Sequence, residues 1–241
     1  MPESPCGDRY LDTPKGRVFV RTHASPDFIA SLRLDDGMGI FSGPHYPPAR
    51  EKKALERIAA KEGSNVIIAY TAEGLIVGFV VIAEPSQAER WGKLAGHGLV
   101  EAMAIEVSRN WRSLGIADKM MECAMGDPYF RDKIVICTGY TWHWDLENTG
   151  MSKEDYRRML LSYLSKAGFM YYETDEPNVN LDPANFLTAY VGPQADPRLL
   201  DLFEDLLFMQ KGWADFRGRP RTIKEVLREE REKREMAPGG A

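Results

Sequence analysis

The sequence predicts a mixed α/β protein in which one sheet of six or seven strands is flanked by helices. Residues 99–107 form a nearly continuous apolar run, which is typical of a central strand covered on both faces. A polar turn and a helical pattern follow at once, and a second apolar run comes at 133–138. This order favours parallel pairing of the two strands, because the connection between them must cross over the sheet.

The N-terminal part predicts a leader, a strand and two helices. Residues 1–16 hold three prolines and two glycines among polar residues, so we expect little regular structure there. Residues 17–22 alternate as a strand does. Ser25-Pro26 predicts the start of a short helix, and Pro48 opens a second one after a loop rich in glycine and proline.

The middle of the chain predicts a hairpin and a long helix. Two apolar runs, 65–70 and 75–82, flank a short turn and predict a β-hairpin. Ser152 and Asp155 have the spacing of a capping box, which predicts a helix that ends at Gly168. The residues expected on its inner face are Tyr156, Met159, Leu160, Tyr163, Leu164 and Ala167.

Beyond this helix the pattern is less regular. Residues 169–174 predict a strand, and Asp182-Pro183 predicts a short helix that ends at Gly192. Residues 197–210 predict either a helix or a helix that gives way to a strand near 206–210.

These patterns divide the chain into a flexible leader at 1–16, a single domain at 17–213 and a charged extension at 214–241. In the extension, Thr222 and Glu225 form a capping box, and oppositely charged residues four apart follow it. We expect a solvated helix here; an arm that docks on a partner is the alternative.

Composition excludes several classes of protein. The chain has 241 residues, a net charge of −5 and a pI near 5.5, so binding of nucleic acid through phosphate neutralisation is not expected. Three scattered cysteines argue against a disulfide framework and a zinc site, and we expect no metal. No signal peptide or long uncharged apolar run is visible, which predicts a cytoplasmic protein without a membrane span.

The turn after the central strand has the pattern Arg112-x-x-Gly115-x-Ala117. Small residues let the backbone approach another molecule, and the amides of a helix's first turn lack intrahelical partners. Such amides bind phosphate, and Arg112 would add positive charge. The amides expected in this cradle are those of Ser113, Leu114, Gly115, Ile116 and Ala117. An ordinary strand-to-helix turn is the alternative interpretation.

The hairpin, the central strand and this turn together resemble the Gcn5-related N-acetyltransferase (GNAT) superfamily, whose acetyl-CoA motif is Arg/Gln-x-x-Gly-x-Gly/Ala directly after a strand. From about Arg17 to about Trp213 the chain is similar to the acetoin-utilisation acetyltransferase family of that superfamily. The blocks that carry this similarity are Glu89-Arg90-Trp91, Ala104-Ile105-Glu106-Val107, Trp142-His143-Trp144-Asp145-Leu146, Thr174-Asp175-Glu176-Pro177 and Pro183-Ala184-Asn185.

The resemblance implies the GNAT acyl-CoA N-acyltransferase fold, whose sheet splays beside the central strand, and acetyl-CoA as the acetyl donor. It implies that the pyrophosphate lies on the turn and that the pantetheine arm pairs with the backbone of Ala104, Ile105, Glu106 and Val107. The implied acceptor is a lysine of acetyl-CoA synthetase, whose acetylation switches that enzyme off.

Glu101 lies eleven residues before Arg112, where related lysine acetyltransferases place the general base. An amine must lose a proton before it attacks a thioester, and a free lysine titrates at about 10.4. Burial in an apolar strand would raise the pKa of the Glu101 carboxyl into a useful range, whereas a solvated strand end is the alternative. Glu106 is expected on the opposite face unless a bulge intervenes, in a salt-bridged structural role.

The general acid that would return a proton to the coenzyme A thiolate stays open between several residues. The candidates are Tyr140, Tyr171, Tyr172 and His143. Asn185 is a candidate contact to the pantetheine amides or to a cationic acceptor, and a turn or cap residue is its alternative interpretation.

Two other functions fit the same residues. One is a small-molecule amine N-acetyltransferase. The other is a binding protein that responds to acetyl-CoA and inhibits a partner by docking, in which case a variant unable to transfer acetyl groups would still inhibit.

Overall fold

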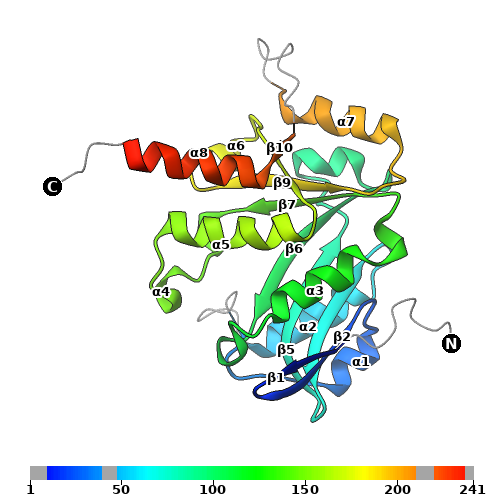
Figure 1. Cartoon of the computed structure of the whole chain (residues 1–241). Helices are drawn as coiled ribbons and strands as arrows, with labels where there is room; N and C mark the ends of the chain where they lie inside the picture. The colour runs from blue at the N-terminus through cyan, green and yellow to red at the C-terminus, as the bar shows by residue number, and fades with distance from the viewer. Residues whose placement is uncertain (1–9, 40–47, 210–219, 237–241) are drawn as a thin grey trace.

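A computed structural model of the chain describes residues 10–39, 48–209 and 220–236 (Figure 1). Within these ranges ten strands form one mixed sheet in the order β1-β2-β4-β5-β6-β7-β9-β8-β10, with β3 beside β5. The strands are β1 (Tyr10–Thr13), β2 (Gly16–Arg21), β3 (Arg33–Leu34), β4 (Asn65–Thr71), β5 (Leu75–Ala83), β6 (Leu99–Val107), β7 (Ile134–Gly139), β8 (Met170–Tyr172), β9 (Phe186–Val191) and β10 (Arg221–Thr222).

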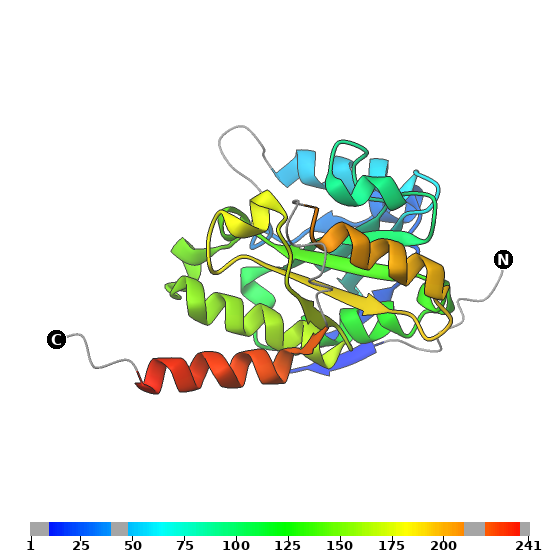
Figure 2. The ribbon, with the colours of Figure 1, turned by 90° about the horizontal axis from the view of Figure 1, so that it is seen from above.

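Helices cover both faces of this sheet. They are α1 (Pro26–Ser31), α2 (Pro48–Ala59), α3 (Ile116–Met125), α4 (Leu146–Thr149), α5 (Lys153–Lys166), α6 (Pro177–Asn180), α7 (Pro197–Leu207) and α8 (Ile223–Met236), with short 3-10 turns η1 (Arg90–Leu94), η2 (Arg109–Trp111), η3 (Pro128–Phe130) and η4 (Thr141–His143). One face packs against α3, α5 and α8, and the other against α1, α2, η1 and α7. Figure 2 shows the sheet between these two layers. No described helix is long and apolar enough to cross a bilayer.

The central strand β6 is paired differently along its two edges. Its β5 edge is paired from Glu101 to Val107, antiparallel. Its β7 edge is parallel, as predicted, but the pairing covers only Leu99–Glu101 against Ile134–Ile136. Beyond that point the two strands separate, so the sheet splays and β6 keeps an open edge. The mixed α/β class and the splay expected from the resemblance are confirmed.

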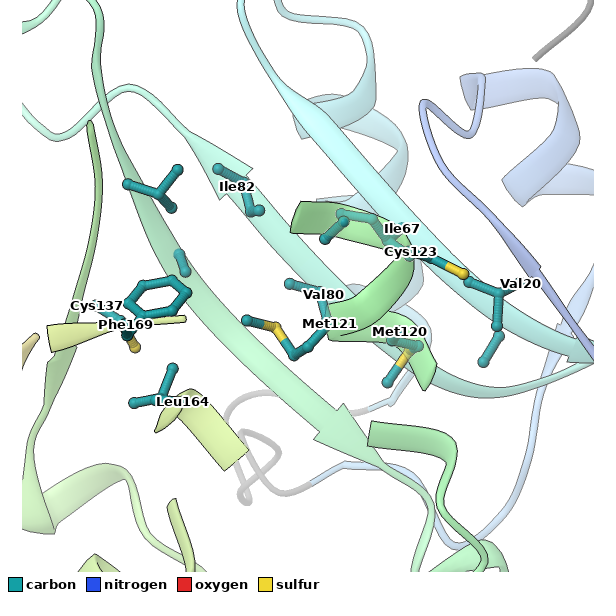
Figure 3. Close-up of a cluster of buried hydrophobic side chains, with 14 of the residues drawn as sticks. Val20, Ile67, Val80, Ile82, Met120, Met121, Cys123, Cys137, Leu164 and Phe169 are labelled. Atoms are coloured by element: carbon teal, nitrogen blue, oxygen red, sulfur yellow. The ribbon is translucent and has the colours of Figure 1, made fainter. Parts of the chain in front are cut away.

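The apolar face below α3 explains why this strand–helix unit forms. Met120 and Met121 of α3 pack on Val80 of β5, and Leu164 of α5 joins the same cluster (Figure 3). These positions follow helical spacing in the sequence, so burying them fixes α3 against the sheet. The buried face of α5 differs from the predicted one. Leu161, which was not predicted on the inner face, is fully buried, whereas Met159 and Tyr163 line a cavity described below.

Several elements differ from the sequence-based expectation. The six or seven strands become ten because β1, β3 and β10 are short additions and β9 was expected to be a helix. The leader was expected to run to residue 16, but β1 pairs with β2 as a hairpin turned by Gly16, whose φ is 109°. Residues 1–9 of that leader lie outside the described ranges.

The largest error concerns the helix predicted to end at Gly192. Asp182 caps only a tight turn, in which its carboxylate accepts the Ala184 amide at 2.8 Å. The following residues form β9, which lies between β7 and β8 with most of its side chains buried. An apolar run buried on both faces has no alternation to distinguish it from a short helix. For residues 197–207 the helix interpretation is confirmed, as α7.

The charged extension is not simply solvated where it is described. Arg221 and Thr222 pair with β8, and Ile223 and Val226 of α8 are buried against the body of the protein. The buried Arg157 of α5 forms an ion pair with Glu230 at 2.5 Å. The last turns of α8 are exposed and extend away from the sheet in Figure 1.

Candidate active site

A cavity of about 750 Å³ lies where β6 and β7 separate. Its walls come from the open edge of β6, the turn into α3, the end of β7 with η4, and one face of α5. Of the residues predicted to bind the coenzyme, those that line it are Ala104, Ile105, Val107, Arg112, Ser113, Gly115, Ile116 and Ala117. The structure therefore brings the two halves of the predicted cofactor site into one space.

A bulge interrupts β6 inside this wall. Ile82 is paired with Ala102 and Val81 with Ala104, so Met103 is the extra residue. Met103 is 50% exposed although its neighbours in the strand are largely covered. The bulge also shifts the alternation of side chains, which puts Glu101 and Glu106 on the same face of the sheet because their β5 partners Ala83 and Phe79 are four residues apart. Plain alternation predicted opposite faces.

The turn into α3 has a backbone that favours an anion. Gly115 is the N-cap of α3 and has a left-handed conformation with φ 78°, and Ser113 also has a positive φ of 62°. The Lys119 amide donates to the Gly115 carbonyl at 3.0 Å, which is the first hydrogen bond of the helix, so the amides before Lys119 have no partner within the helix. Leu114 is not a lining residue; its side chain packs on the core.

Arg112 is held by a carboxylate that the sequence analysis assigned no role. Its Nη2 donates to Asp145 Oδ2 at 2.7 Å, and Arg109 lies 3.4 Å from the same oxygen. Burial alone would raise the pKa of Asp145, but hydrogen bonds from Asn148 and Arg112 outweigh it and lower that pKa. The block Trp142–Leu146 thus supplies the residue that orients the two arginines at the cavity.

A second carboxylate fixes the turn from the other side. Asp35, after β3, accepts hydrogen bonds from Ser108, from the Asn110 side chain at 2.9 Å and from the Trp111 indole at 3.3 Å. Burial would raise its pKa, yet these donors together lower it. The turn is therefore held rigid by partners about 75 residues away in the chain, which no local pattern could have indicated.

Glu101 is buried, with 7% of its surface exposed, on the face of β6 that packs toward α7. Burial raises the pKa of its carboxyl to about 7, and repulsion from Glu89 raises it further. The hydrogen bond from Thr138 acts in the opposite direction and lowers this pKa. The Thr138 hydroxyl donates to Glu101 Oε1 at 3.0 Å. Glu101 does not line the cavity, but Thr138 does, so this hydroxyl connects the carboxyl to the cavity.

The four candidate acids occupy different places. Tyr140 and His143 line the cavity. Tyr172 is buried against Phe203 on the far face, and Tyr171 lies below the Arg157 guanidinium. Burial raises the pKa of Tyr140 and lowers that of His143, so both hold their neutral forms.

The side chains of two residues predicted to contact the coenzyme have partners within the protein. Glu106 is buried, and its carboxylate accepts the Gly39 amide at 2.6 Å, away from the cavity. Asn185 accepts the Thr141 amide and donates to the Asn178 carbonyl, both at 2.8 Å. It therefore fixes the segment after β7, as the turn interpretation held, and does not line the cavity. Among the described residues, no group of three or more His, Cys, Asp or Glu side chains could hold a metal ion.

Comparison with known proteins identifies relatives over most of the chain, although no family model matches it. The acetoin utilization protein AcuA of Bacillus licheniformis is 31% identical over 198 residues, which cover 82% of this chain and 92% of that protein. AcuA of Bacillus subtilis is 30% identical over 83% of this chain and 93% of its own. The crystal structure of an acetoin utilization protein from Exiguobacterium sibiricum superposes with a TM-score of 0.78 at 32% identity, covering 84% of this chain and 93% of that one. The chain therefore belongs to the AcuA family of acetoin utilization proteins.

Proposed function

We propose that this N-acetyltransferase moves the acetyl group of acetyl-CoA to a lysine side chain of acetyl-CoA synthetase. One observation carries the proposal: an open strand edge and a helix N-terminus meet around one cavity, and the lining residue Thr138 connects a buried carboxyl with a raised pKa to it. The first two can hold a thioester coenzyme, and the third can take the proton of an amine.

In this proposal the coenzyme lies along the open edge of β6. The pantetheine amides pair with peptide groups of residues 104–107, which no described strand pairs with on the β7 side. The pyrophosphate binds the amides of residues 113–117, where the helix dipole also favours negative charge. Arg112 and Arg109, both oriented by Asp145, add positive charge at the same end of the cavity.

Glu101 acts as the general base. Its pKa of about 7 leaves it largely ionised at slightly alkaline pH, yet far more basic than an exposed glutamate. The amine approaches from the face of the sheet on which Glu101 lies, while the acetyl group is presented from the cavity. Peptide amides at the Met103 bulge can polarise the thioester carbonyl.

The acceptor is argued from the family. The relatives are named for acetoin utilization. The resemblance in sequence implies the synthetase as the protein that is acetylated. Acetyl-CoA synthetase is incubated with this protein and acetyl-CoA, and the product is analysed by peptide mass spectrometry. We expect one lysine to be acetylated with loss of synthetase activity.

The same experiment separates the other functions. Acetylation of free amines with none on the synthetase would favour a small-molecule acetyltransferase. Inhibition of the synthetase by the Glu101→Gln variant, in stoichiometric amounts and without acetylation, would favour a docking protein. Either result would overturn the proposed acceptor.

A further inference from the structure

Three of the described residues that line the cavity are lysines or arginines, and they are held differently. Arg109 and Arg112 share one oxygen of Asp145, whose side chain is only 6% exposed. Lys166, in the last turn of α5, donates from Nζ to Asp118 Oδ2 at 2.8 Å. This ion pair is open to solvent, with 60% of the lysine side chain and 37% of the aspartate side chain exposed. Exposed ion pairs contribute little to stability, so Lys166 can bind a further partner.

The pair of Lys166 and Asp118 lies immediately beyond the proposed pyrophosphate site. Asp118 is in the first turn of α3 and directly follows residues 113–117, whose amides form the proposed phosphate cradle. Lys166 comes from α5, and both members of the pair line the cavity. The Lys166 ammonium lies 5.7 Å from the centre of the ring of Tyr163, another lining residue. The ion pair therefore connects two walls of the cavity next to the cradle.

The second oxygen of the Asp118 carboxylate has no hydrogen-bond donor within the described part of the chain. This oxygen, Oδ1, is buried, whereas Oδ2 accepts the hydrogen bond from Lys166. A buried acceptor without a donor is unfavourable and uncommon in folded proteins. Because Asp118 lines a cavity that has room for a coenzyme, a donor group on the ligand is the partner that Oδ1 fits.

Coenzyme A carries the matching groups on its ribose. The 5′ carbon bears the pyrophosphate, the 3′ carbon bears a second phosphate, and the 2′ carbon beside it bears a hydroxyl. The protein places a cation beside a carboxylate oxygen that lacks a donor, and the ribose places an anion beside a hydroxyl donor. The lysine ammonium has three hydrogens, so Lys166 can donate to a phosphate while it still donates to Asp118.

We propose that Lys166 and Asp118 bind the phosphorylated ribose of the coenzyme, with Lys166 Nζ on the 3′-phosphate and Asp118 Oδ1 accepting the 2′-hydroxyl. This inference rests on the proposed use of acetyl-CoA and adds a specificity to it. The protein distinguishes coenzyme A from dephospho-coenzyme A, which lacks the 3′-phosphate. The 3′-phosphate is at the opposite end of the coenzyme from the sulfur, so the pair affects binding of the coenzyme and leaves the transfer step unchanged.

Calorimetry with two ligands and two matched variants tests Lys166. The wild type should bind coenzyme A about tenfold more tightly than dephospho-coenzyme A, as expected for one charge-assisted hydrogen bond. Lys166→Gln should bind both ligands alike, with kcat at saturating acetyl-CoA within about twofold of the wild type. Lys119→Gln is the control, because Lys119 carries the same charge on the same end of α3 but pairs with Glu122 and does not line the cavity. This control should keep the preference of the wild type.

Two nucleotide fragments test Asp118 separately. Adenosine 3′,5′-bisphosphate should displace coenzyme A from the wild type at a concentration about fivefold lower than its 2′-deoxy analogue requires, because only the ribose form has the 2′-hydroxyl. Asp118→Ala should remove this difference between the two fragments. Competition calorimetry against coenzyme A measures both ratios.

The outcomes separate this inference from the proposed function. Equal binding of coenzyme A and dephospho-coenzyme A by the wild type, a preference that survives in Lys166→Gln, or an equal loss of preference in Lys119→Gln would overturn the site. A preference for the 2′-hydroxyl that survives in Asp118→Ala would also overturn it. All of these results leave coenzyme binding and acetyl transfer intact. Absence of coenzyme A binding and of acetyl transfer in the wild type would instead refute the proposed function.

Discussion

Glu101→Gln is expected to lower kcat by about 10²- to 10⁴-fold near neutral pH, which is the usual contribution of a positioned general base. Glutamine has the size of the glutamate and can still contact Thr138, but it cannot accept a proton. Because Glu101 lies outside the cavity wall, coenzyme A should bind with nearly unchanged affinity. Steady-state kinetics and calorimetry measure the two quantities. Unchanged turnover would remove Glu101 from the mechanism.

The pH dependence of the wild type provides a further check. The carboxylate is the active form, and it is populated only above a pKa of about 7. The kcat/KM should therefore rise as pH increases through about 7, and this limb should disappear in Glu101→Gln. The difference between the two proteins should narrow at high pH, because a growing fraction of the lysine is then already deprotonated.

The same substitution should stabilise the fold in alkaline solution. Burial raises the pKa of Glu101 from 4.5 in the unfolded chain to about 7, so the folded state binds its proton more tightly. The stabilising contribution of that proton is complete below pH 4.5 and is lost as pH rises through 7. At pH 8 the ionised carboxyl costs roughly 3 kcal/mol. Glu101→Gln should recover up to that amount at pH 8 and nothing at pH 4, measured by urea unfolding.

Gly115→Glu is expected to weaken coenzyme A binding by at least about 100-fold. A carboxylate at the N-cap of α3 would lie beside the pyrophosphate, and two like charges about 4 Å apart near a protein surface repel by several kcal/mol. Isothermal calorimetry with coenzyme A measures the effect.

Gly115→Ala is the matched control, because it introduces the same backbone strain at φ 78° without the charge. The added Cβ would lie 3.7 Å from Leu11, an ordinary contact, so the variant should fold. We expect a much smaller loss of affinity in Gly115→Ala. Equal losses in both variants would assign the effect to the backbone, and unchanged affinity in Gly115→Glu would contradict the phosphate cradle.

The parts of the fold that follow local rules were predictable from the sequence. Ser25, Ser152 and Pro48 begin helices where expected, and the 65–83 hairpin and the parallel β6–β7 pair are present. Capping and periodicity are properties of neighbouring residues, so one sequence is enough to show them.

The parts that depend on distant partners were not predictable. The bulge at Met103 arises from pairing with β5, and it reverses the expected relation between Glu101 and Glu106. Asp145 contacts Arg112 across 33 residues, and Thr138 contacts Glu101 across 37. No periodic pattern reports such contacts. A glutamate within an apolar strand was a usable signal for a raised pKa, but the threonine that modulates it became visible only in three dimensions.

The central claim is that the open edge of β6 and the N-terminus of α3 together bind one coenzyme A molecule. Amide hydrogen–deuterium exchange with and without coenzyme A tests it most directly. Saturating coenzyme A should slow exchange in two segments, 104–107 and 113–117, and should do so far less in Gly115→Glu. Unchanged exchange in both segments of the wild type, with protection confined to another part of the chain, would contradict the account.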